Sequence, residues 1–206
     1  MLPWETIARL GAVIKGGTPM KYLIAPCAAI VAATILPAAA AAAGITYDCD
    51  TAANHFSELV LPAPVGPFTV SGTVQLNALA EVTKYTPLAR VWISSPSKPG
   101  QSPESFAGVS VSALPVDAKK NPTGSPAIQM VGFNVAGKED EIEPLSMLVK
   151  AGGPQAFSLS FDGRNVSASI ANDRRILPVK SSAPVVRFIC STGEFLFTNV
   201  TIQSSR

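Results

Sequence analysis

The sequence is poor in the residue types that most often carry catalysis or bind metal ions. Its 206 residues include one histidine, three cysteines and two tryptophans. The one histidine, His55, is accompanied neither by a G-x-S-x-G motif nor by a cysteine partner, so no Ser-His-Asp or Cys-His nucleophile is indicated. The cysteines and the histidine are also scattered along the sequence, so they do not form the cluster of ligands that a zinc site requires. We therefore expect no metal and no cofactor, and a surface position for His55.

Charge is also scarce, and beyond the N-terminal segment it balances. Charged residues make up 15% of the chain, and the formal net charge is +2. Residues 1–43 carry three basic residues and one acidic residue, so residues 44–206 carry 13 of each sign. No basic stripe remains in that part. Nucleic acid and anionic membrane surfaces are therefore not expected partners.

Apolar and small residues are in excess at 20–43. Lys21 precedes the apolar stretch 22–36, and a proline and an alanine tract follow, ending at Ala43. A positive charge, a short apolar run and small residues at the exit are typical of a secretory signal peptide, which we expect to form a signal helix. Cleavage after Ala43 would leave Gly44 as the new N-terminus. The localisation expected is secreted or periplasmic, by bacterial-type export.

Alternatives to this interpretation of the N-terminal segment stay open. Residues 22–43 are long enough to span a membrane as a retained anchor, although two prolines interrupt them. Cys27 raises the alternative of a lipidated cysteine. Residues 1–19 fit none of these schemes, and we expect them to be a start-site artefact or an extended n-region, with Met20 as the true start. Residues 44–206 are the right length for a single domain, with no membrane association after cleavage.

Two cysteines remain in 44–206, one near each end. In an oxidising compartment the isolated pair Cys49 and Cys190 predicts a disulfide. The alternative is two separate buried thiols. A bridge would close a loop of about 140 residues and tie the first strand to one of the last, stabilising the fold by roughly 4–5 kcal/mol on the chain-entropy model.

Alternation of apolar and polar residues with a period of two dominates residues 44–206, with no convincing helical pattern. A pair of alternating runs around Asp162-Gly163 predicts a hairpin. About nine or ten short strands without helices predict an all-β fold with two packed antiparallel sheets, a sandwich or jelly roll. Strands are expected at 68–77, 89–94, 107–113, 127–135, 145–149, 157–161, 166–170, 185–190 and 194–202.

The segment 155–202 resembles the closing segment of concanavalin A-like lectin and glucanase domains. In those domains a hairpin of the form F-x-x-x-x-D/N-G-x-x-V-x-x-x-I precedes a final strand of the form G-x-F-x-F-x-N-V-x-I. Residues 157–170 and 193–202 match these two patterns. The resemblance implies a jelly-roll sandwich whose first and last strands run side by side, which would suit a bridge between Cys49 and Cys190. It also implies polysaccharide as the ligand class.

Residues 139–143 form an acidic cluster. On a strand, Glu139, Glu141 and Glu143 would project to one face, as the paired carboxylates of retaining glycosidases do. The cluster resembles the E-x-D-x-E signature of family 16 glycoside hydrolases, except that Glu141 replaces the central aspartate. A lysine before the cluster and a proline after it instead favour a solvated loop, so these are catalytic candidates only, with calcium binding as a further alternative.

Trp92 is the residue we single out for ligand binding. It alternates with Val91 and Ile93, which we expect to face the core, so Trp92 and Arg90 share the polar face of their strand. An exposed aromatic ring there would stack on the apolar face of a sugar, with Arg90 donating hydrogen bonds and Tyr85 beside them. The alternative is that a loop covers Trp92 as part of a satellite core.

The sequence therefore predicts an exported, non-catalytic β-sandwich at the cell exterior that binds carbohydrate or has a structural role. The question of an enzyme stays open. One alternative function is a glycan-active hydrolase that uses Glu139 and Glu143. Another is an adhesion or assembly module with an envelope protein as partner.

Overall fold

The computed structural model describes residues 44–80, 85–117, 119–120, 127–137, 143–149 and 153–205. The predicted signal segment 20–43 and residues 1–19 lie outside these ranges and stay predictions. Within the described ranges, no helix has the length and apolar character needed to pass through a bilayer.

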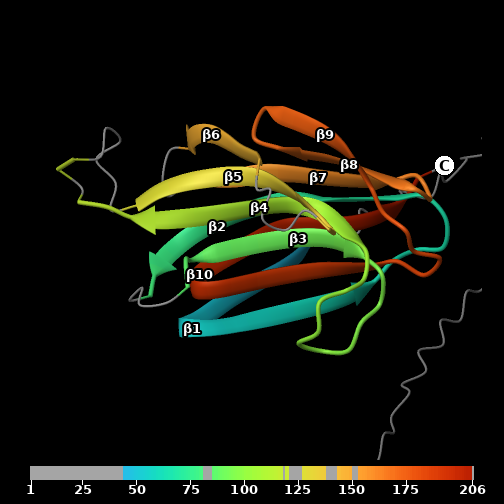
Figure 1. Ribbon diagram of the computed structural model, residues 1–206, viewed down its shortest axis with the longest axis horizontal. Helices are drawn as coiled ribbons and strands as arrows, with labels where there is room; N and C mark the ends of the chain where they lie inside the picture. Colours follow the sequence, from blue (N-terminus) through green and yellow to red (C-terminus); the bar gives the residue numbers. More distant parts are fainter. Residues whose placement is uncertain are drawn as a thin grey trace, which may run out of the picture. The chain divides into compact units, whose positions relative to one another are not determined.

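The described residues form ten strands and no helix, so the all-β prediction is confirmed (Figure 1). The strands make one hydrogen-bonded antiparallel sheet in the order β6-β5-β4-β3-β10-β2-β7-β8-β9, and β1 pairs with β10. Their bounds are β1 Ile45–Pro62, β2 Phe68–Leu79, β3 Leu88–Ser94, β4 Phe106–Pro115, β5 Ala127–Val135, β6 Glu143–Val149, β7 Gln155–Phe161, β8 Asn165–Ile170, β9 Asp173–Pro178 and β10 Val185–Ser204.

The predicted hairpin around Asp162 is confirmed as β7 and β8, which pair in register from Phe161 and Val166 outward. Gly163 has a φ of 103°, a conformation that glycine adopts without steric cost. One oxygen of the Asp162 carboxylate accepts the backbone N–H groups of Arg164 at 2.8 Å and of Asn165 at 2.7 Å. The bond from Asn165, followed by that from Arg164, lowers the pKa of Asp162. The turn is therefore closed by an ionised carboxylate.

Strand β10 is where one sheet becomes two. Its first part, 185–191, pairs with β3, and its second part, 193–204, pairs with β2. Thr192 between them has a φ of 54°, and the buried Thr51 hydroxyl donates to the carbonyl of Gly193 at 2.9 Å. We call the layer β6-β5-β4-β3 with 185–191 sheet I, and the layer β9-β8-β7-β2 with 193–204 sheet II; β1 borders both.

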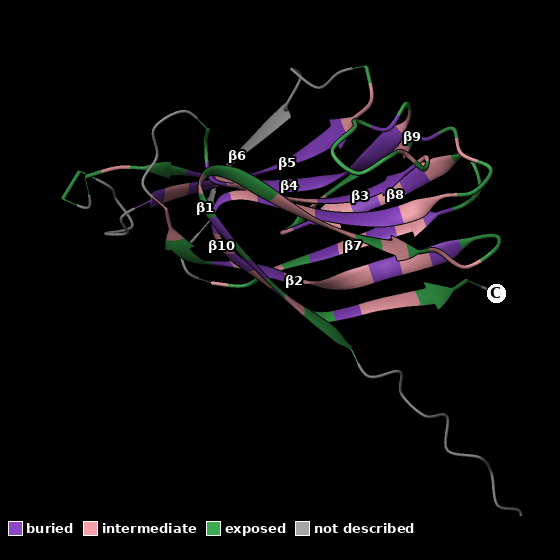
Figure 2. Ribbon diagram, turned by 90° about the horizontal axis from the view of Figure 1, so that it is seen from below, coloured by how far each residue is buried: buried purple, intermediate pink, exposed green. Residues whose placement is uncertain are grey.

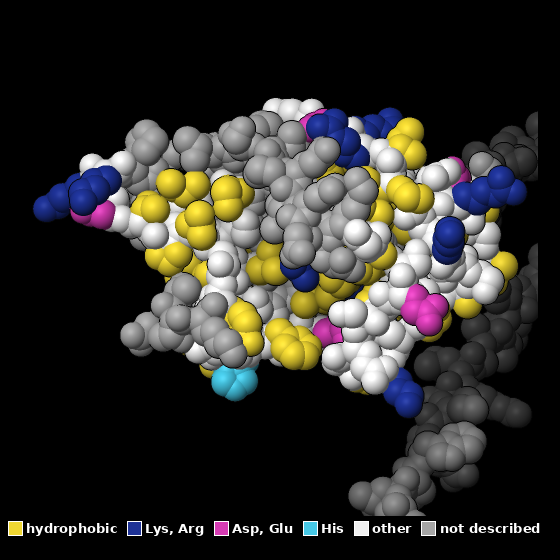
Figure 3. All heavy atoms as spheres, viewed as in Figure 1, with side chains coloured by type: hydrophobic (Ala, Val, Ile, Leu, Met, Phe, Trp, Pro, Cys, Tyr) yellow, Lys and Arg dark blue, Asp and Glu magenta, His cyan; other side chains and the backbone are white. Residues whose placement is uncertain are grey.

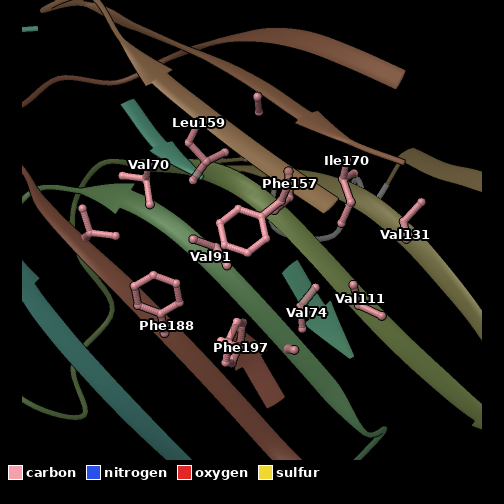
Figure 4. Close-up of a cluster of buried hydrophobic side chains, with 14 of the residues drawn as sticks. Val70, Val74, Val91, Val111, Val131, Phe157, Leu159, Ile170, Phe188 and Phe197 are labelled. Atoms are coloured by element: carbon pink, nitrogen blue, oxygen red, sulfur yellow. The ribbon is translucent and has the colours of Figure 1, made fainter. Parts of the chain in front are cut away.

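The core fills the space between the two layers (Figures 2 and 4). Phe157 of sheet II meets Phe188 of sheet I edge to face, with ring centroids 6.4 Å apart. Phe188 in turn meets Phe197 at 5.3 Å. Each strand contributes alternate residues to this core, as the period-two pattern predicts. The arrangement is that of a jelly-roll sandwich.

The predicted disulfide between Cys49 and Cys190 is confirmed, with a Cα–Cα distance of 6.3 Å. The two residues are not paired in register, because Cys49 lies opposite Phe195 whereas Cys190 lies opposite Ser57. The bridge therefore links the sheet II part of β1 to the sheet I part of β10, across the bend at Thr192. It holds the two layers together at their shared border.

The sequence pattern gave no bounds for β1, missed β9 and divided β10. The segments predicted at 185–190 and 194–202 are one continuous strand, β10. A first strand carrying Cys49 was expected without bounds, and β9 was not predicted. β1 has mostly exposed or half-buried residues, and β9 lies at the open edge of sheet II, so neither buries enough of one face to show a regular alternation.

Candidate functional site

The candidate site lies on the face of sheet I that points away from the core. Alternation along β3 sends Ala89, Val91 and Ile93 into the core and leaves Arg90 and Trp92 on this outer face. The predicted assignment of Arg90 and Trp92 to one face is therefore correct. In the space-filling view, hydrophobic side chains gather over this face of the molecule and charged ones are sparse (Figure 3).

A loop at 95–105, between β3 and β4, covers one half of the outer face. The loop closes on itself through the backbone N–H of Ser95, which donates to the carbonyl of Ser105 at 2.8 Å. Trp92 below it is only 7% exposed, and its ring stacks on Phe106 at a centroid distance of 4.1 Å. The expectation of an exposed stacking platform at Trp92 is thus wrong, because the loop and Phe106 cover the ring. The alternative of a satellite core is the arrangement observed.

Arg187 holds this loop in place from below. The arginine is 1% exposed and pairs with the carboxylate of Glu58 on β1. Its Nε donates to the hydroxyl of Ser94 at 3.0 Å, and its Nη2 donates to the hydroxyl of Ser97, within the loop, at 2.7 Å. Arg187 was not predicted from the sequence, because a charged residue that alternates with core residues normally faces solvent.

The other half of the outer face is an open groove of about 630 Å³. Two aromatic residues at the groove are partly exposed to solvent, Phe56 at 62% and Tyr85 at 49%. Tyr85 was predicted to lie beside Arg90, and both line this groove. Phe56 was missed because the expected first strand was given no bounds. The described residues that line the groove are Asn54, His55, Phe56, Tyr85, Thr86, Leu88, Arg90, Ser112, Leu114, Met130 and Ser191.

Arg90 stands at the boundary between the open and the covered half. Besides the groove, it lines two smaller cavities of about 140 and 80 Å³, each of which Trp92 also lines. The guanidinium carbon lies 5.0 Å from the centre of the indole ring, a cation–π contact. Desolvation by burial lowers the pKa of Arg90. Arg90 is therefore a partly buried cation held against an aromatic ring.

At the same boundary, three buried polar atoms have no hydrogen-bond partner in the part of the chain that the structure describes. They are Nε of Arg90, Nε1 of Trp92 and Oδ1 of Asn134. All three residues line the 80 Å³ cavity, together with Ser102 and Phe106. Buried polar atoms are nearly always paired, so three unpaired ones on residues around one small cavity need an explanation.

The carboxylate candidates are not brought to this groove by any described contact. Glu139 and Glu141 lie outside the described residues, and Glu143 begins β6, opposite Phe133 of β5. Among the described residues that line the groove, none is Asp or Glu. His55 is exposed at the groove, as predicted for the surface, and its Nδ1 lies 2.9 Å from the carbonyl of Ala53. In the described ranges, no group of three or more His, Cys, Asp and Glu residues is placed to hold a metal ion.

Comparison with known proteins gives matches by structure alone. No family model matches the sequence, and no curated protein matches it. Solved structures that the chain resembles include the lumenal domain of VIP36 (9% identity, TM-score 0.42, covering 77% of this chain and 79% of that one), Xenopus laevis galectin-Ib (6%, 0.39, 71% and 100%) and a Bacteroides ovatus mixed-linkage glucan GH16 protein (10%, 0.37, 76% and 79%). They are lectins and a glucanase, the classes that the C-terminal sequence pattern resembles. At these identities and TM-scores, the likeness assigns no role to any residue of this chain.

Proposed function

We propose that residues 44–206 are an exported, non-catalytic β-sandwich domain that binds polysaccharide in the groove over sheet I. The observation that carries the proposal is the lining of this groove. The exposed rings of Phe56 and Tyr85 offer apolar faces, while Arg90 and the hydroxyl residues Ser112 and Ser191 supply polar groups. Sugars present an apolar ring face and polar hydroxyls, so they need both kinds of group side by side.

Export is supported by the disulfide and by the predicted signal segment 20–43. A bridge between Cys49 and Cys190 persists in oxidising compartments such as the periplasm or the cell exterior. An exported domain would be in the same compartment as envelope and extracellular polysaccharides.

Two other functions stay as alternatives. A glycan-active hydrolase would depend on Glu139 and Glu143, and replacing either by glutamine would abolish the release of reducing sugar. Assembly with an envelope protein is favoured by the exposed hydrophobic residues of β1, where Val60 follows Phe56 on the same face. A pull-down that depends on Val60 but not on Tyr85 would favour assembly over glycan binding.

The decisive experiment is a glycan array with the oxidised full chain, together with the variants Phe56→Ala and Tyr85→Ala. Ile176→Ala is the matched control, because Ile176 is an exposed hydrophobic residue on β9 of sheet II, outside the groove. We expect saturable binding to one class of glycan, weakened at least tenfold by each groove variant and unchanged by the control. A flat array, or equal binding by all four proteins, would refute the proposal.

A further inference from the structure

Two arginines share the outer face of sheet I, and of the two only Arg187 has a counter-ion among the described residues. Arg187 is paired with Glu58 and bonded to two serine hydroxyls. The described contacts of the Arg90 guanidinium consist of its cation–π contact with Trp92, with no carboxylate and no hydrogen bond. Taking a cation out of water without a partner is costly, so an anion from outside the chain that paired with Arg90 would offset that cost.

The residues that carry the unpaired groups around Arg90 line one small cavity. Nε of Arg90 and Nε1 of Trp92 are both N–H donors, and both residues line the 80 Å³ cavity. A cavity of that size has room for a carboxylate or sulfate group, or for a few water molecules. Two N–H donors and a positive charge suit an oxyanion, which accepts charge-assisted hydrogen bonds.

The third unpaired group, Oδ1 of Asn134, is compatible with such a ligand. The oxygen could accept a hydrogen bond from a sugar hydroxyl next to the anionic group. Rotation of the amide by 180° would turn its NH₂ toward the oxyanion instead.

Arg90 also connects this cavity to the open groove, since it lines both. A sugar ring that packs on Tyr85 or Phe56 in the groove would direct a charged substituent toward Arg90. We propose that Arg90 and Trp92 bind the carboxylate or sulfate of an acidic sugar residue, so that the polysaccharide ligand is anionic. This inference rests on the proposed function, and it adds the charge class of the ligand.

The test uses three sugars that share one ring: glucose, glucuronate and glucose 6-sulfate. Trp92 is the only tryptophan in 44–206, so in the oxidised full chain carrying Trp4→Phe its fluorescence reports the site directly. We expect a saturable change with glucuronate or with glucose 6-sulfate at a concentration at least tenfold below that of glucose. Which of the two anions acts distinguishes a carboxylate site from a sulfate site.

The variants Arg90→Gln and Arg90→Lys identify the residue responsible. Arg90→Gln should remove the preference for the charged sugar, and Arg90→Lys should keep part of it, because the charge stays and the planar donor geometry is lost. The melting temperature of Arg90→Gln should stay the same or rise, since the variant removes an unpaired cation, whereas a structural arginine would lower it. Arg164→Gln, at an exposed arginine of the β7–β8 turn, is the control and should change nothing.

The two proposals fail in different ways. Equal responses to all three sugars, or a preference that survives in Arg90→Gln, would overturn the anionic-ligand inference while the groove remains a glycan site. If Phe56→Ala loses array binding but neither charged sugar changes the fluorescence, the groove is again a glycan site and the anionic-ligand inference is overturned. A flat array and no fluorescence response to any sugar would overturn both proposals.

Discussion

Replacing Arg187 with methionine should destabilise the fold and uncover Trp92. The substitution keeps most of the side-chain volume but leaves the carboxylate of Glu58, which is 13% exposed, without its partner. Breaking a buried ion pair from one side costs about 3–5 kcal/mol of the free energy of unfolding, because the remaining charge is left uncompensated. The loop at 95–105 also loses its hydrogen bond from Arg187 to Ser97, worth about 1 kcal/mol.

A second substitution separates these two effects. The double variant Arg187→Met with Glu58→Met removes both charges, so only the loop anchor and the packing change remain. Replacing a buried ion pair by apolar residues of similar volume is often close to neutral. We compare it with the single variants Arg187→Met and Glu58→Met. The double variant should be at least about 2 kcal/mol more stable than the sum of the two single effects predicts.

The assay is urea unfolding of the oxidised protein, followed by the fluorescence of Trp92 in the Trp4→Phe background. Both variants that lack Arg187 should show a red-shifted emission before unfolding, because the loop is no longer tied over the indole ring. Additive single and double changes, within about 0.5 kcal/mol, would refute the claim that Arg187 and Glu58 act as a pair. An unshifted emission spectrum would refute the claim that Arg187 holds the loop.

Three further predictions concern the framework of the domain. Gly108→Ala should prevent normal folding or lower the free energy of unfolding by about 3 kcal/mol or more. The reason is that the added Cβ would lie 1.9 Å from the carbonyl oxygen of Val91. Normal expression and an unchanged melting temperature would contradict this. Reduction of Cys49–Cys190, which closes a separation of 141 residues, should lower the free energy of unfolding by about 5 kcal/mol on the chain-entropy model, as measured by unfolding with and without reductant; overlapping curves would count against it. Asp162→Asn should reduce the loss of stability at acid pH. Folding lowers the pKa of Asp162, so the carboxylate stabilises the fold fully above its unfolded pKa of about 4. That stabilisation is lost as the pH falls through the folded pKa. Melting curves between pH 2 and 7 check this, and identical acid limbs in both proteins would disprove it.

The sequence predicted those parts of the fold in which local pattern and burial agree. The residues of β2, β7 and β8 alternate strictly because each strand has one face on the core, and Asp162-Gly163 marks the turn between two of them. The pairing of Cys49 with Cys190 also followed from the sequence, because two lone cysteines have only one way to pair. In each case one constraint was enough for the prediction: the local alternation for the strands, and the number of cysteines for the disulfide.

The site was less predictable because its key contacts join residues far apart in the chain. Glu58 and Arg187 are separated by 129 positions, and neither looks unusual among its neighbours. The cover over Trp92 comes from the loop at 95–105, whose proline and serine residues indicate a loop but not the surface on which it folds. Alternation placed Trp92 on the correct face of β3, but it could not show whether that face is open to solvent.

The contrast between the two arginines shows what burial alone would have hidden. Arg187 is more deeply buried than Arg90, yet its charge is matched by Glu58 and its remaining donors are bonded to serines, so nothing further is required of it. Arg90 is less buried but has no such partner among the described residues, and it lies where the open groove meets the covered cavity. A charge that a fold compensates serves stability, whereas a charge that it leaves uncompensated at the wall of a groove favours a ligand of opposite sign. Of the three ligand-binding residues predicted from the sequence, Arg90 is therefore the one whose replacement should change the choice of ligand, while loss of Tyr85 should weaken binding to neutral and charged sugars alike.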